Sequence, residues 1–346
     1  MSTYFLFGKN LFGEEIKPKP TGPLAERFIF PPFSVLDARQ GEWQRRKRAW
    51  IACGIESELG RNSEDFAIGD KATWTKQNKK IEPGGGGGPN SCYLRKGSSE
   101  KYGVNAHLSE KAQTALGCYG AYGKTTTDRA QGSATGTSIF DPTLCELIYR
   151  WFCVPGGQVV DPFAGGSVRG IVAALLGLNY WGCDLRPEQI EANRQQADVI
   201  CGDIMPKWEC GDSLDMLPQA PFADLIFSCP PYGDLEIYSD NPRDLSTMEY
   251  HTFMPAMKRI ILQASLKLKP GGMACFVVGD FRDKRTGNYR GFVADTIHAF
   301  RDVGLHLYND AILVTAVGSL PIRVSNQFEK SKKLGKTHQN VLVFRR

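Results

Sequence analysis

Two short motifs in the second half of the chain place glycine, proline and polar residues directly after apolar runs. The first, DPFAGGS at 161–167, carries Gly165 and Gly166, which let a ligand approach the backbone closely. The second, CPPY at 229–232, follows the apolar run DLIFS, and its two prolines stiffen a loop between a cysteine and a tyrosine. Ligands of open parallel sheets bind beyond the carboxyl ends of the strands, which is where we expect both loops.

Two acids end the strands predicted between these motifs. Asp184 ends the run YWGCD and is placed to accept hydrogen bonds from a ribose diol. Asp212 ends the next strand and is placed to meet an adenine edge. The segment has no G-x-G-x-x-G fingerprint, and no Gly-Lys-Ser/Thr follows its glycines. These features favour a ligand that contains adenosine but no pyrophosphate.

With these residues identified, the segment resembles the S-adenosylmethionine-dependent DNA amino-methyltransferases, which modify N6 of adenine or N4 of cytosine. DPFAGGS is similar to their cofactor loop, and CPPY occupies the place of their catalytic tetrad. The stretch TSIFDPTLCELIYRWFCVPGG at 137–157 resembles the segment that closes over the methionine end of the cofactor. The resemblance covers roughly residues 137–346. It implies an α/β fold of the Rossmann-like class I methyltransferase type, with a mostly parallel seven-stranded sheet and helices on both faces.

The resemblance also implies roles for individual residues. S-adenosyl-L-methionine is the implied cofactor, a base flipped out of double-stranded DNA is the implied substrate, and no metal is implied. Tyr232 would stack on the flipped base. The implied catalytic residues are Ser228, Cys229, Pro230, Pro231 and Tyr232. The implied cofactor-binding residues are Thr137, Ser138, Phe140, Asp161, Pro162, Phe163, Gly165, Gly166, Ser167, Asp184, Leu185, Asp212 and Ser213.

The tetrad departs from the family pattern at its first position. The family has Asp, Asn or Ser there, and the side-chain oxygen accepts a hydrogen bond from the amino group that is methylated. Cys229 stands at this position, and a thiol is a weak acceptor. Either Ser228 supplies the oxygen after a local shift, or the main-chain carbonyl beside Pro230 takes over more of the role.

Three alternatives to an amino-methyltransferase remain open. Cys229 as a nucleophile on C6 would make the chain a C5-pyrimidine DNA methyltransferase. An RNA N2-guanine methyltransferase shares this fold and a PPY-type loop. A DNA-binding relative without activity would keep the fold, although Asp161, Asp184 and Tyr232 are all present.

The first 135 residues differ from the remainder in charge and composition. They hold 20 Lys and Arg against 14 Asp and Glu, whereas the remainder holds 22 against 23. Five consecutive glycines at 84–88 are typical of a flexible loop. We therefore expect a basic, partly flexible region for target recognition at 1–135 and the catalytic domain at 136–346. The predicted DNA contacts are Arg45, Arg46, Lys47, Arg48, Lys79, Lys80, Arg282 and Arg285.

Two parts of this interpretation have a structural alternative. In the predicted helix around 43–51, basic and aromatic residues interleave, and the tryptophans could equally pack into the core. The charged segment 325–340 is predicted as a turn between the last two strands.

Composition favours a protein without membrane spans or disulfides. No apolar run reaches the length of a transmembrane helix, and the N-terminus does not match a signal peptide. The ten cysteines are scattered without C-x-x-C, and the five histidines share no ligand spacing. We expect free thiols and a cytoplasmic site-specific DNA methyltransferase. The N-terminal run from 31 to 61 resembles methylases carried by phages and mobile elements. This resemblance implies either modification that protects foreign DNA, as in restriction-modification, or an orphan methylase.

Overall fold

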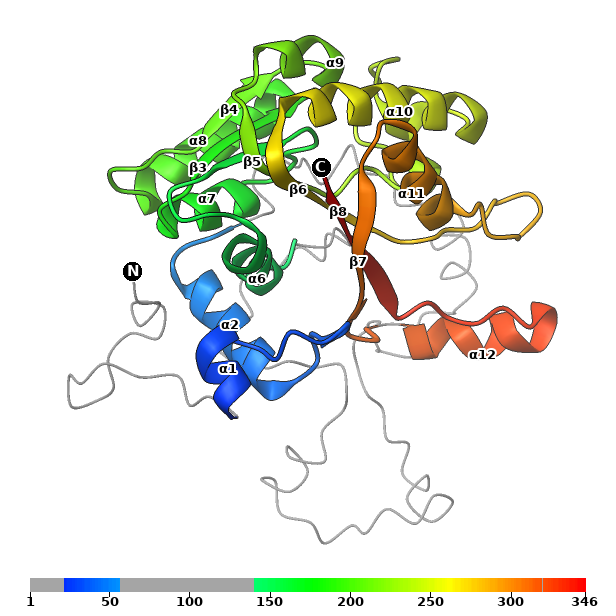
Figure 1. Ribbon diagram of the computed structural model, residues 1–346. Coiled ribbons are helices and arrows are strands. Elements are labelled where there is room, and N and C mark those ends of the chain that lie inside the picture. The colour runs from blue at the N-terminus through cyan, green and yellow to red at the C-terminus, as the bar shows by residue number, and fades with distance from the viewer. Residues whose placement is uncertain (1–21, 57–139, 319) are drawn as a thin grey trace, which may run out of the picture. The chain divides into compact units, whose positions relative to one another are not determined.

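A mixed sheet of eight strands forms the centre of the structure (Figure 1). This computed structural model describes residues 22–56, 140–318 and 320–346. The strands are β1 (Val35–Asp37), β2 (Gln158–Asp161), β3 (Asn179–Asp184), β4 (Lys207–Cys210), β5 (Ala223–Ser228), β6 (Leu268–Val278), β7 (His306–Val314) and β8 (His338–Arg345). Thr137, Ser138, Lys79, Lys80 and the glycines at 84–88 lie outside the described residues.

The strand order is β1-β7-β8-β6-β5-β2-β3-β4. Neighbouring strands are parallel except that β8 runs antiparallel to both β6 and β7. Strands β2 to β8 form a seven-stranded, mostly parallel sheet, so the predicted Rossmann-like fold is confirmed. The eighth strand, β1, was not predicted, because three residues are too few to show a strand period.

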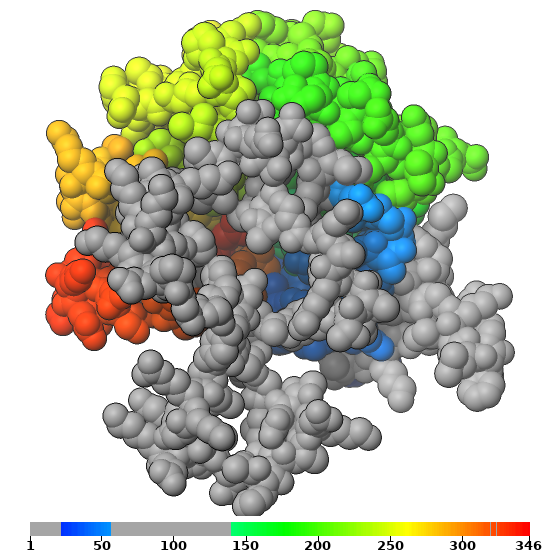
Figure 2. Space-filling view, turned by 180° about the vertical axis from the view of Figure 1, so that it is seen from behind, coloured from blue at the N-terminus to red at the C-terminus, as the bar shows by residue number. Residues whose placement is uncertain are grey.

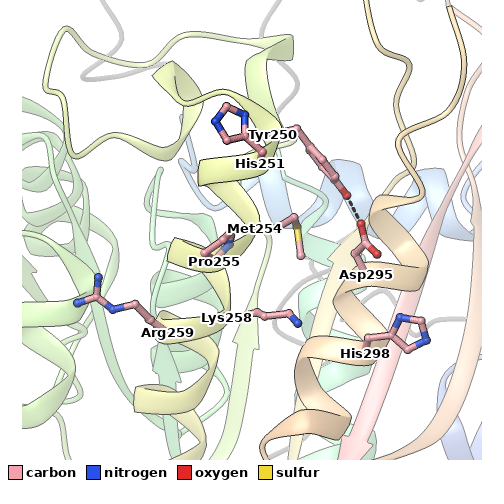
Figure 3. Close-up of a pocket in the computed structure, with 8 residues that line it drawn as sticks. All are labelled: Tyr250, His251, Met254, Pro255, Lys258, Arg259, Asp295 and His298. Carbon is pink, nitrogen blue, oxygen red and sulfur yellow. Dashed lines mark hydrogen bonds between the residues drawn. The ribbon is translucent and has the colours of Figure 1, made fainter.

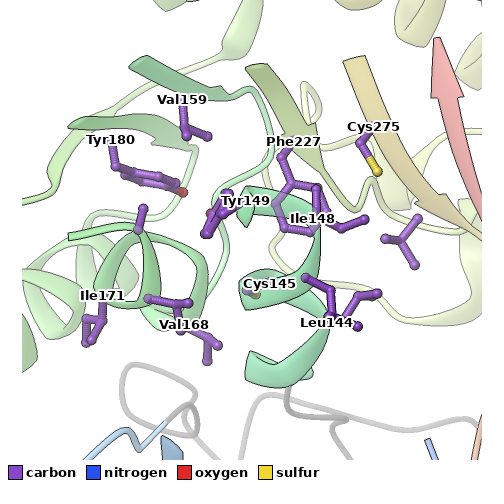
Figure 4. Packing of buried hydrophobic residues seen from close by; sticks show 14 of the residues in the cluster. Leu144, Cys145, Ile148, Tyr149, Val159, Val168, Ile171, Tyr180, Phe227 and Cys275 are labelled. Atoms are coloured by element: carbon purple, nitrogen blue, oxygen red, sulfur yellow. The ribbon is translucent and has the colours of Figure 1, made fainter. Parts of the chain in front are cut away.

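Helices cover both faces of this sheet, as the family resemblance implied (Figure 1). Successive strand residues point to opposite faces, so Val159 and Val160 pack into two different hydrophobic clusters. The helices are α1 (Pro23–Phe28), α2 (Gly41–Ala52), α6 (Pro142–Phe152), α7 (Val168–Leu175), α8 (Pro187–Ile200), α9 (Ser213–Met216), α10 (Tyr250–Lys267), α11 (Phe292–Asp302) and α12 (Leu320–Ser331), with 3-10 turns η2 (Leu217–Gln219), η3 (Gly233–Leu235) and η4 (Leu245–Thr247). The first cluster joins α2, α6, α7 and α8 to the sheet, and Figure 4 shows part of its packing around Tyr149 and Phe227. The second cluster joins α10 and α11 to the other face.

Residues 22–56 belong to the same compact unit as the sheet. This unit comprises Met1–Ile68, Thr135–Ala316 and Lys336–Arg346. Within it, β1 extends the sheet, and Trp43 and Trp50 of α2 are buried in the first cluster. The backbone of Glu56 then exchanges two hydrogen bonds with the side chain of Gln196 on α8. Figure 2 shows blue residues from the N-terminal part of the chain next to green ones. The predicted domain boundary at residue 135 therefore does not separate residues 22–56 from the sheet.

The second unit comprises Gly69–Ala134 and Val317–Gly335, and its described part contains α12. The prediction of a charged turn at 325–340 was wrong over the residues that α12 occupies. Leu320, Val324 and Phe328 recur every fourth residue, which is the spacing of one helix face. Among the described helices, none combines the length and the apolar composition that crossing a bilayer requires.

Candidate active site

Asp161, at the end of β2, is the centre of a buried polar network. Its Oδ2 atom accepts hydrogen bonds from Arg169 Nε at 2.6 Å and from the Tyr180 hydroxyl at 2.7 Å. Its Oδ1 atom accepts from Ser228 Oγ at 2.5 Å and from the backbone N–H of Phe163 at 3.1 Å. The carboxylate is fully buried, and these four donors match its acceptor capacity. Asp161 therefore fixes the shape of the 161–167 loop and the end of β5 through its own hydrogen bonds.

Arg169 on α7 is the partner of Asp161 that the sequence analysis missed. Beyond its ion pair, its guanidinium donates to the carbonyls of Phe163 at 2.5 Å and Ala164 at 3.0 Å. It also lies 4.5 Å from the centre of the Phe140 ring. A buried cation needs such partners, and the sequence signal was a lone arginine in the apolar helix pattern VRGIVAAL.

The glycine loop and Asp184 meet at the carboxyl ends of β2 and β3. Gly165 has φ +50°, a conformation that side chains disfavour, and its N–H donates to Asp184 Oδ2 at 3.0 Å. The other oxygen, Oδ1, accepts from the backbone N–H of Arg186 at 3.0 Å. Burial raises the pKa of Asp184 above its ordinary value of 3.8. Asn193 of α8, also missed by the sequence analysis, holds the loop by donating to the Gly165 carbonyl at 2.7 Å.

Asp212 caps the N-terminus of α9 and is paired with an arginine from a distant loop. Its Oδ1 atom accepts from the backbone N–H of Leu214 at 2.8 Å, and its Oδ2 atom lies 2.8 Å from Arg243 Nε. Arg243 also contacts Asp215 at 2.6 Å, so one cation bridges both acids. The backbone N–H of Gly211 donates to the Asp184 carbonyl at 2.9 Å. The two predicted adenosine acids thus lie on adjoining strand ends, as expected from parallel pairing of β3 and β4.

The other predicted cofactor residues divide by exposure. Ser167 and Ser213 are buried, and their hydroxyls donate to Gln196 Oε1 at 3.1 Å and to the Pro162 carbonyl at 2.5 Å. Their side chains therefore support the loops. Pro162 is also buried, whereas Phe140, Phe163, Gly166 and Leu185 are partly exposed.

The CPPY loop follows β5, the neighbour of β2, and its polar atoms form a second small network. The thiol of Cys229 lies 3.7 Å from the Tyr232 hydroxyl, which accepts from Gln339 Nε2 at 2.8 Å and donates to the Val277 carbonyl at 3.3 Å. Burial raises the pKa of the Cys229 thiol above 9.0. The Tyr232 ring packs 5.9 Å from that of Phe292. Pro230 is buried and Pro231 is partly exposed. Ser228 is fully buried, and its hydroxyl donates to Asp161 Oδ1.

The predicted DNA contacts on α2 need a correction at Arg46. Its side chain is buried and lies 2.6 Å from both oxygens of the fully buried Glu146, which also accepts from Trp50 Nε1 at 2.9 Å. A guanidinium held in this way cannot reach a phosphate, so the prediction for Arg46 was wrong. The alternative, a helix that buries its tryptophans, holds for this part of α2.

The remaining described basic residues of the prediction lie nearer the surface. Arg45 pairs with Glu42 at 2.6 Å and Lys47 with Asp141 at 3.2 Å, while Arg48 is exposed. In the loop between β6 and α11, Arg282 lies 3.9 Å from the centre of the Tyr289 ring. Arg285, at the tip of this loop, is exposed.

A separate groove of about 540 Å³ lies between α10 and α11 (Figure 3). Its lining includes His251, Lys258, Arg259 and His298, and the Tyr250 hydroxyl donates to Asp295 at 2.6 Å across it. None of the predicted site residues lines it. Within the described residues, no three His, Cys, Asp or Glu side chains are grouped to hold a metal ion.

No family model and no curated protein matches the chain. Among solved structures, TrmN from Thermus thermophilus is 16% identical with a TM-score of 0.40, and the match covers 60% of this chain and 49% of TrmN. The chain thus spans about half the length of that protein. A proposed DNA modification methylase, also from Thermus thermophilus, is 21% identical with a TM-score of 0.30, over 39% of this chain and 50% of the other. A TehB-like SAM-dependent methyltransferase from Corynebacterium glutamicum is 17% identical with a TM-score of 0.37, over 58% and 85%. Because each of these TM-scores is below 0.5, we base the function on the residues of the site.

Proposed function

We propose that the chain is an S-adenosylmethionine-dependent DNA methyltransferase that modifies the exocyclic amino group of a flipped base, either N6 of adenine or N4 of cytosine. One observation carries the proposal. The carboxylate of Asp161 binds both the DPFAGGS loop and Ser228, the residue directly before CPPY. Hydrogen bonds to Asp161 therefore hold the DPFAGGS loop, which suits a methyl donor, next to the CPPY loop, which suits a target amine.

The residues at the ends of β2, β3 and β4 fit this cofactor. Asp184 offers a carboxylate beside Gly165, and an ideal Cβ on Gly165 would meet no atom within 4 Å, so the loop is open toward a ligand. Asp184 would hold the ribose hydroxyls, and Asp212 the adenine edge. When bound, S-adenosylmethionine supplies an electrophilic methyl group on a sulfonium. The chain contributes binding and orientation.

The CPPY loop suits direct transfer to an amino group. Transfer in line from a bound donor needs positioning more than acid–base chemistry. The carbonyl of Cys229 precedes two prolines that limit its movement, so it is suited to accept a hydrogen bond from the amine. Tyr232 would stack on the base. Burial raises the pKa of the Cys229 thiol, which disfavours the thiolate that the C5 mechanism needs.

Double-stranded DNA is the substrate we propose, with exposed cations as phosphate contacts. Arg48 on α2 and Arg285 in the β6–α11 loop are the exposed members of the predicted set within the described residues. Such contacts position the duplex without reading its sequence.

The test is methyl transfer from labelled S-adenosylmethionine to unmodified duplex DNA and to RNA, followed by nucleoside digestion and mass spectrometry. We expect N6-methyladenine or N4-methylcytosine from DNA, and the same product from a Cys229→Ala variant. A 5-methyl product that disappears in Cys229→Ala would replace this mechanism with the C5 one. Label found in RNA alone would contradict the choice of DNA.

A further inference from the structure

Gln339 lies beside the CPPY loop although it is more than a hundred residues away in sequence. Because β8 is antiparallel, its first residues lie at the carboxyl edge of the sheet, where Asn340 pairs with Val278. The side-chain amide of Gln339 donates to the Tyr232 hydroxyl at 2.8 Å. A Cβ on Gly279 would lie 3.3 Å from the Tyr232 ring and 3.7 Å from Gln339 Cγ, so this glycine leaves room for both side chains.

Methyl transfer to an exocyclic amine is favoured when both amino hydrogens have acceptors, because the nitrogen lone pair is then directed at the methyl group. The main-chain carbonyl of Cys229 is one acceptor in the proposed site. The second would be a side-chain oxygen at position 229, where this chain has a thiol, a weak acceptor. The site therefore lacks one acceptor that the reaction would use.

Two neighbouring oxygens are already engaged. Ser228 is fully buried, and its hydroxyl is directed at Asp161. The Tyr232 hydroxyl accepts from Gln339 and donates to the Val277 carbonyl. Gln339 differs from both, because its Nε2 atom faces Tyr232 while its Oε1 atom accepts no hydrogen bond from any described residue. The Gln339 side chain is partly exposed, at the carboxyl edge of the sheet.

We propose that Oε1 of Gln339 supplies the second acceptor for the target amine, in place of the oxygen that Cys229 lacks. This inference rests on the proposed function. In the reaction, the base nitrogen forms a bond to the methyl carbon, the carbon–sulfur bond breaks with its electron pair left on sulfur, and one amino proton leaves to water. Gln339 accepts a hydrogen bond from the amine throughout and exchanges no proton.

Gln339 could instead act only by positioning Tyr232, without contacting the amine. A rescue experiment distinguishes this role from that of a direct acceptor. Gln339→Leu removes the acceptor, and the double variant Gln339→Leu with Cys229→Asn restores an oxygen at the position the family uses. Asn340→Leu is the matched control, since Asn340 neighbours Gln339 on β8 but bonds to Asp310 at 3.2 Å. The measurements are the single-turnover rate of methyl transfer to DNA, the Kd for S-adenosylhomocysteine by calorimetry, the Kd for DNA by anisotropy, and Tm.

We expect Gln339→Leu to slow transfer by roughly 10²-fold, with both Kd values within about threefold of the wild type, and Asn340→Leu to match the wild type. The double variant recovers at least about a tenth of the wild-type rate. Gln339→Glu, which keeps an acceptor, stays faster than Gln339→Leu and serves as the test if the leucine variant lowers Tm.

Two results would overturn the inference alone. One is a wild-type rate in Gln339→Leu, and the other is a slow Gln339→Leu that Cys229→Asn does not rescue, which would leave Gln339 as a support for Tyr232. A wild-type protein that methylates no DNA would instead overturn the proposed function, and this inference with it.

Discussion

The hydroxyl of Ser228 donates a 2.5 Å hydrogen bond to Oδ1 of Asp161, across 67 residues of sequence. The contact exists because β2 and β5 are parallel neighbours, paired at Val159 with Leu225 and at Val160 with Ile226. It joins the two motifs that carry the proposed chemistry. This buried hydrogen bond fixes the distance between the DPFAGGS loop and the CPPY loop.

Removing the charge of Asp161 should destabilise the fold strongly. In Asp161→Asn, the buried guanidinium of Arg169 loses its counter-charge, and breaking a buried pair in this way costs about 3–5 kcal/mol. Urea denaturation measures the effect. Asp302→Asn is the control, because it breaks an exposed pair with Lys258 and should cost less than about 1 kcal/mol. Equal losses in the two variants would contradict the central role of Asp161.

The sequence predicted those parts of the site that are local in the chain. Glycines after a strand, acids at strand ends and a Pro-Pro loop each follow from neighbouring residues, and the parallel order of the sheet then brings Gly165, Asp184 and Asp212 to one edge. These features could be predicted because short-range spacing determines them.

The parts that could not be predicted depend on partners far away in the chain. Arg46 appeared to be one of four surface cations, but Glu146, 100 residues later, holds it inside the fold. Arg169 and Gln339 carry no motif, and their importance follows only from the side chains they meet, Asp161 and Tyr232. The spacing of residues along the chain does not predict such long-range pairs.

Cofactor affinity should fall as pH decreases, because of Asp184. Burial raises the pKa of this carboxyl, so it takes up a proton at a higher pH than an ordinary aspartate with a pKa of 3.8. The protonated form is a poorer acceptor for ribose hydroxyls, and the affinity for S-adenosylhomocysteine therefore decreases as pH falls through the raised pKa. Calorimetry across this range measures the effect. Asp184→Asn should bind more weakly at neutral pH and lose this pH dependence; a variant that keeps it would point to another group.

Exposed arginines should set the salt dependence of DNA binding. Each phosphate contact contributes a slope of about 0.9 in log K against log salt concentration, so Arg285→Ala and Arg48→Ala should each lower the slope by about 1. Fluorescence anisotropy at several salt concentrations measures it. Arg301→Ala is the control, because Arg301 is exposed at the C-terminal end of α11, away from the edge where Arg285 lies. An unchanged slope in Arg285→Ala would exclude this loop from the phosphate-binding surface.

Arg243 should weaken cofactor binding, and its removal should strengthen it. The guanidinium lies against Oδ2 of Asp212, the acid proposed to meet the adenine edge, and a second pair with Asp215 holds it there. Adenine must compete with this cation, and the positively charged donor is also repelled by it. Because the Arg243 side chain is half exposed and therefore partly solvated, the gain in Arg243→Ala should be modest, up to about fivefold in Kd for S-adenosylmethionine. Salt screens exposed pairs, so the wild-type affinity should approach that of the variant as ionic strength rises. A weaker Kd in Arg243→Ala would show instead that this arginine orients Asp212 for the ligand.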